Sequence, residues 1–132
     1  MLLQGLGSVF ANAALPQKIV LLLLAAAVPL VVVATGLALR RGVHGDLWRR
    51  VVADLRVAGP VVGLFVGGLN GFHMGETIQR LPFDPTLKQL APGIFEISTL
   101  VSLGGLVGVV AMAALATIEL LSPRRPSAPE PA

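Results

Sequence analysis

Long apolar runs divide this chain into three segments of membrane-spanning length. The first, 19–39, carries no charge, and at about 1.5 Å per residue it covers a hydrocarbon core of about 30 Å. The second run covers about 57–75, and the third covers about 91–121 with Glu96 as its early charge. The chain is therefore predicted to be an all-α membrane protein whose transmembrane helices occupy residues 18–39, 57–79 and 91–121.

Polar or interrupted segments separate these runs. Pro29 in the first run is expected to bend its helix, which a membrane bundle tolerates. The first residues lack the Lys or Arg that opens a signal peptide. The remaining segments are predicted to be an interfacial arm at 1–17, a basic loop at 40–56, an outer hairpin at 80–90 and a disordered tail at 122–132.

Composition supports lipid as the main solvent. The chain has 132 residues, of which 55% are hydrophobic and 13% are charged, whereas a soluble domain has about 25% charged residues. The absence of cysteine excludes disulfides, thiolate metal sites and cysteine nucleophiles. The modest basic excess is spread over short loops, so nucleic acid is not an expected partner.

The distribution of Lys and Arg predicts the orientation. Seven lie in segment 40–56 and in the tail, while Lys18, Arg80 and Lys88 lie on the other side. Basic loops stay in the cytoplasm. We therefore expect the N-terminus outside, the C-terminus in the cytoplasm, and a multi-pass protein of a bacterial inner membrane.

Glycines recur at every fourth position of the second run, at Gly59, Gly63, Gly67, Gly71 and Gly75. A weaker series in the third run contains Gly104 and Gly108. Membrane helices associate through close van der Waals packing, and glycine lets backbones approach. The pattern predicts a glycine zipper for helix packing, although a glycine-rich membrane helix also produces such spacing by chance.

Glu96 is the leading candidate for chemistry. An ionisable group in an apolar helix usually faces a bundle interior or water, where it can carry a proton. Thr99 and Ser102 follow it at steps of three and complete the candidate proton path, although such hydroxyls most often bond their own backbone. In the alternative, Glu96 lies at headgroup depth, four residues after Pro92, which is expected to open the helix.

Other polar residues carry weaker signals. Asn70 lies within the second run and is expected to form a hydrogen bond across a helix interface. His73 and Glu76 are three residues apart, but two ligands do not make a metal site, and interfacial solvation explains them better. We expect no metal, no cofactor and no catalytic residue, because no acid–base pair, metal spacing or nucleophile constellation is present.

Two motifs resemble the MotA/TolQ/ExbB proton channel family. They are Pro60-Val-Val-Gly-Leu-Phe65 and Ala91-Pro-Gly-Ile-Phe-Glu96, the latter followed by Gly104. The resemblance covers roughly 57–110 and is closest to TolQ-like and ExbB-like members. It departs from the family where pore threonines fall on Gly67 and Val101, where a late proline falls on Val110, and in the lack of long cytoplasmic helices, as in a minimal or degenerate member.

The resemblance implies a homo-oligomer, by analogy a pentamer, that encloses the single transmembrane helix of a TolR/ExbD-like partner. Such a complex uses the proton motive force for mechanical work, and Glu96 would line its pore. The alternative is a small accessory or scaffold subunit of a larger respiratory or photosynthetic membrane complex, without proton conduction. Neither function is that of an enzyme.

Overall fold

The computed structural model describes residues 4, 7, 14–40 and 44–122. Its three long helices are α2 (Leu15–Leu39), α3 (Gly45–Gln79) and α4 (Leu87–Leu121), and the described part of the chain contains no strand. All three are long and apolar enough to cross a membrane. The prediction of an all-α chain with three helices of membrane-spanning length and composition is confirmed for the described residues. Apart from residues 4 and 7, the arm before residue 14 lies outside the described residues, as does the tail after 122.

α2 begins earlier than the apolar run does, because Gln17 caps its first turn. The Gln17 side-chain oxygen accepts a hydrogen bond from the backbone N–H of Ala14 at 2.8 Å, and Pro16 occupies the first turn, where no N–H is needed. Pro29 lies inside the helix, as the sequence predicted.

α3 differs most from the expectation. Residues 40–56 were expected to form a loop, but the helix already begins at Gly45, about three turns before the apolar run. Trp48, Val52 and Leu55 recur at helical spacing within this charged segment, and Val52 is fully buried while the other two pack against the core. These three apolar residues form a narrow stripe that packs against the other helices and stabilises the first turns of α3. The mean hydropathy of the segment does not reveal the stripe, because charged residues separate its members.

α4 also begins earlier than predicted, at Leu87 rather than Ala91. The side-chain oxygen of Gln89 accepts a hydrogen bond from the backbone N–H of Thr86 at 2.9 Å, which caps the first turn. The expectation that the helix starts at Pro92 was therefore wrong, since Pro92 lies inside α4. The connection between α3 and α4 is correspondingly shorter than the predicted hairpin. This connection and the end of the bundle that holds it are called outer below, after the predicted orientation.

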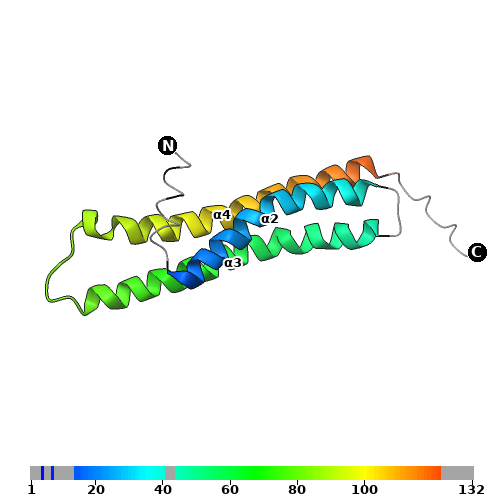
Figure 1. Cartoon of the computed structure of the whole chain (residues 1–132). Helices are drawn as coiled ribbons and strands as arrows, with labels where there is room; N and C mark the ends of the chain where they lie inside the picture. Colours follow the sequence, from blue (N-terminus) through cyan, green and yellow to red (C-terminus); the bar gives the residue numbers. More distant parts are fainter. Residues whose placement is uncertain (1–3, 5–6, 8–13, 41–43, 123–132) are drawn as a thin grey trace, which may run out of the picture.

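α3 and α4 form an antiparallel pair joined by the outer connection, and α2 lies across both (Figure 1). Glycines bring the pair into backbone contact. A Cβ atom on Gly63 would lie 2.6 Å from the backbone oxygen of Leu100 and 3.0 Å from Cα of Gly104, closer than real Cβ atoms are found. A Cβ on Gly59 would lie 2.6 Å from the side chain of Val107. These contacts fix the register of α3 against α4.

The remaining glycines of the two series contribute unequally. A Cβ on Gly67 would touch Val101 at 3.0 Å, and one on Gly108 would meet Pro60 and the backbone oxygen of Arg56 at 3.2 Å. Gly71 has only ordinary contact with α4, and no atom across the interface lies near Gly75. The backbones of α3 and α4 therefore approach each other most closely near the middle of the two helices.

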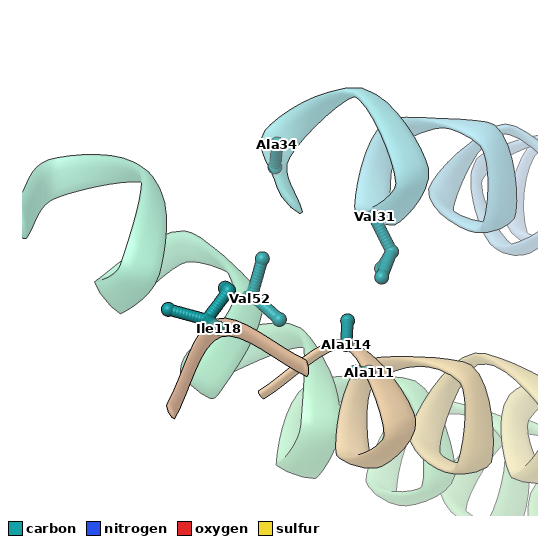
Figure 2. Close-up of a cluster of buried hydrophobic side chains, with 6 residues drawn as sticks. All are labelled: Val31, Ala34, Val52, Ala111, Ala114 and Ile118. Carbon is teal, nitrogen blue, oxygen red and sulfur yellow. The ribbon is translucent and has the colours of Figure 1, made fainter. Parts of the chain in front are cut away.

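Two apolar clusters join α2 to this pair. One contains Leu21, Leu24 and Ala27 of α2 with Leu100 and Val107 of α4. The other lies at the opposite end of the bundle, where Figure 2 shows Val31, Ala34, Val52, Ala111, Ala114 and Ile118 pointing toward one another from the three helices.

The outer surface of the bundle is mainly apolar. Leu23 and Phe65 are each 65% exposed, and Val109 is 60% exposed. A surface of this kind is suited to contact with lipid. Near the second cluster, Arg49 of α3 and Glu119 of α4 form an exposed ion pair at 3.3 Å.

We predict that Gly63→Ala lowers the free energy of unfolding by about 1–3 kcal/mol, because the new methyl group meets backbone atoms that have no room to move. Denaturation in mixed detergent micelles, followed by the fluorescence of Trp48, measures this change. Gly36→Ala in α2 is the control, since a Cβ there meets nothing within 4 Å. It should leave stability unchanged or raise it by up to about 1 kcal/mol through helix propensity. Equal effects of the two changes would contradict the proposed contact.

Candidate functional site

Glu96 lies well inside α4. The helix begins at Leu87, so Glu96 is more than two turns from the first residue, beyond the reach of the unpaired N–H groups of the helix end. The N-terminal charge of the helix therefore does not explain this carboxylate.

The Glu96 side chain is partly buried, and its Oε1 atom is enclosed without a hydrogen-bond partner among the described residues. On the same helix Leu100 and Val107, four and eleven residues later, belong to the apolar cluster against α2. This spacing places Glu96 on the same side of α4, one turn closer to the outer end. A buried acceptor without a partner costs about 1–3 kcal/mol, so the fold tolerates a destabilising group at this position.

A polar layer accompanies Glu96 at this level. Gln17 of α2 donates a hydrogen bond from Nε2 to Oδ1 of Asn70 of α3 at 2.9 Å, and the bond is partly buried. This contact confirms the expected interhelical hydrogen bond of Asn70. Gln17 lies one turn outward from Leu21, as Glu96 lies one turn outward from Leu100, so all three helices change from apolar to polar residues at the same end of the apolar cluster.

The sequence did not identify Gln17, because it stands before the charge-free run and was assigned to the arm. A signal was present, since Gln17 precedes Leu21 and Leu24 at the helical spacing of four and seven. Only tertiary packing shows that its amide reaches Asn70.

The structure gives the hydroxyls of Thr99 and Ser102 different surroundings. The Thr99 hydroxyl donates to the backbone oxygen of Phe95 at 2.7 Å, as hydroxyls in helices commonly do. Ser102 is exposed and stands about 120° around the helix from Glu96. Glu96 and Ser102 therefore lie on different sides of α4, and Ser102 faces the surroundings of the subunit.

His73 and Glu76 are both exposed near the outer end of α3. Glu76 lies 3.9 Å from Arg80, one turn further along the chain. Among the residues that the structure describes, no three His, Asp or Glu side chains lie close enough to hold a metal ion.

A largely apolar cavity of about 330 Å³ separates the end of α3 from the start of α4. Met74 and Ile78 line its α3 side, and Leu90 and Gly93 line its α4 side. Gly93 lies one turn outward from Glu96, and a Cβ atom there would lie 2.6 Å from the Met74 sulfur. The cavity therefore extends from the outer connection to within about one turn of the carboxylate.

Comparison of the whole chain with known protein families, curated proteins and solved structures returned no match.

We predict that Glu96→Leu raises the free energy of unfolding in mild detergent by about 1–3 kcal/mol, because it replaces an unpartnered buried oxygen with an apolar side chain. The same denaturation followed by Trp48 fluorescence measures it. Glu119→Leu is the matched control, because that carboxylate is exposed and ion-paired with Arg49. Its effect should stay within about 1 kcal/mol. Destabilisation by Glu96→Leu would mean that the carboxylate has a stabilising partner.

Proposed function

We propose that this chain is a proton-channel or stator subunit of the MotA/TolQ/ExbB type. Several copies enclose the transmembrane helix of a TolR/ExbD-like partner and couple the proton motive force to mechanical work. The subunit lies in a bacterial inner membrane with its N-terminus outside and its C-terminus in the cytoplasm. Arg residues gather at the end of the bundle where α2 connects to α3. Basic connections stay in the cytoplasm, which supports this orientation.

The observation that carries the proposal is the enclosed, unpartnered carboxylate oxygen of Glu96. Ionisable groups are expensive inside a membrane, and those retained there commonly serve ion or proton movement. A carboxylate that lacks a partner within its own subunit is free to accept a proton or to meet a group from the partner helix.

The outer cavity supports access to this carboxylate. It opens beside the connection between α3 and α4 and reaches Gly93, one turn from Glu96. In the proposed orientation, protons would enter from outside at this end. The Ser102 hydroxyl faces away from the subunit, so it would join the path only where copies or a partner helix cover α4.

The second candidate is an accessory subunit that braces a larger membrane complex. The two hydroxyls favour it, because that of Thr99 is bonded to the backbone of its own helix and Ser102 lies on a different side of α4 from Glu96. Native mass spectrometry after mild-detergent purification separates the two functions. Several identical copies with a single-helix partner support the channel, whereas one copy within a large complex supports the accessory subunit.

We predict that Glu96→Gln abolishes proton flux while leaving assembly intact, because the amide keeps the size of the side chain and cannot carry the proton. The assay measures proton uptake, with an internal pH dye, into liposomes containing the complex purified with its co-purifying partner. Glu119→Gln on the same helix should leave the flux unchanged, since that carboxylate is exposed at the opposite end. Flux that survives Glu96→Gln would exclude the proposed role.

A further inference from the structure

Three charged side chains lie on the first turns of α3 without a visible partner. Arg50, Asp54 and Arg56 are all exposed, and within the described part of the chain their side chains form no hydrogen bond or ion pair. Neighbouring Arg49, by contrast, is paired with Glu119. The environment of the three charges depends on their depth in the membrane.

α4 provides a measure of that depth. Its charge-free segment 97–118 is about 33 Å long, enough to cross the hydrocarbon core. Arg49 lies beside Glu119 at one end of this segment. The backbone oxygen of Arg56 lies beside Gly108, close to the middle of it. The charged part of α3 therefore runs along the cytoplasmic half of an apolar span.

α2 gives the same depth independently. Val52 of α3 shares a buried cluster with Val31 of α2 (Figure 2). Val31 lies two residues from the centre of the charge-free segment 19–39. Asp54 and Arg56 follow Val52 within about one turn, so they too lie alongside the apolar part of α2.

Two of the charges point away from the rest of the subunit. Val52 and Gly59 are buried and mark the side of α3 that faces the other helices. At about 100° per residue, Arg50 lies about 180° and Asp54 about 140° around the helix from Gly59. Gly68 lies about 180° from Gly59 as well, and a Cβ there would meet no atom within 4 Å. This outward side of α3 is called the charged face below.

Lipid does not suit the charged face, because charges inside the hydrocarbon core are costly. If the bilayer were placed closer to the outer end, Asp54 and Arg56 would lie outside the hydrocarbon core. This shift would also move Val33 of α2 and Met112 of α4, which are 58% and 54% exposed, out of the hydrocarbon core. A placement that suits these apolar side chains therefore requires something other than lipid on the charged face.

We infer that the charged face of α3 is the surface through which copies of this chain associate. It carries both signs of charge, with Asp54 one turn from Arg50. The long side chain of an Arg on one copy can therefore reach Asp54 on the next, so the face is complementary to itself. Gly68 lets a neighbouring helix approach further along the same face. A face that is complementary to itself relates two copies by a two-fold axis, so the inference concerns a pair of copies and goes beyond the ring of the proposed function.

Cysteine cross-linking in native membranes tests the surface, since the chain contains no cysteine of its own. Val57→Cys and Val61→Cys lie on the charged face, each about 160° around α3 from Gly59, and both valines are 56% exposed. Val33→Cys and Met112→Cys are controls of similar exposure on the other two helices. Because a disulfide needs Cα atoms within about 7 Å, mild oxidation should link two copies at one or both α3 positions and at neither control.

Charge reversal tests the electrostatic part. Asp54→Arg should weaken self-association in lipid by about tenfold or more, and adding Arg50→Asp should recover most of it. Asp84→Arg, the same change in the exposed outer connection, is the control and should have no effect. Self-association is measured by energy transfer between labelled copies as protein is diluted into lipid.

Several results would overturn the inference: cross-links at Val33→Cys or Met112→Cys instead, links to a different protein, or unchanged association of the Asp54→Arg variant. None of these concerns the carboxylate of Glu96. A complex that assembles through another face could still lose proton flux in Glu96→Gln, so this inference and the proposed function fail separately.

Discussion

The backbone contact between α3 and α4 is the constraint on which the rest of the structure depends. Gly59 and Gly63 leave no room for even a methyl group against Gly104 and Leu100. A shift of less than one turn would replace glycine with a side chain at this contact, and a shift of a full turn, which keeps a glycine there, would separate Arg49 from Glu119. The register is therefore fixed, and with it the level of every other residue: Arg49 stands opposite Glu119, and Arg56 stands opposite Gly108.

Two glutamates on α4 show how surroundings give one residue type different roles. Glu119 is exposed and paired with Arg49, an arrangement that adds little to stability. Glu96 is partly enclosed, and one of its oxygens lacks a partner in the described part of the chain. A carboxylate among the apolar residues of α4 lowers the stability of the fold. This free-energy cost distinguishes Glu96, a candidate for proton transfer, from a surface charge such as Glu119.

The sequence predicted the three helices because hydropathy over long runs depends on composition alone. It did not predict the first three turns of α3, where Trp48, Val52 and Leu55 are separated by charges and become a helical stripe only when α2 and α4 cover them. The candidate site was found in part. Glu96 stands out as a charge in an apolar run, but the side of α4 that it occupies and the Gln17 partner of Asn70 follow from the packing of the helices.

The tight contact at Gly59 and Gly63 also determines how conduction would depend on the amount of protein. A space too small for a methyl group is too small for water, so the centre of the α3–α4 interface offers protons no route. In the proposed channel, the path must then run along α2, along the outside of the α3–α4 pair or along surfaces that separate copies share. Where copies share it, the flux would rise more steeply than in proportion to the protein-to-lipid ratio at low occupancy, because isolated subunits in the bilayer would conduct no protons.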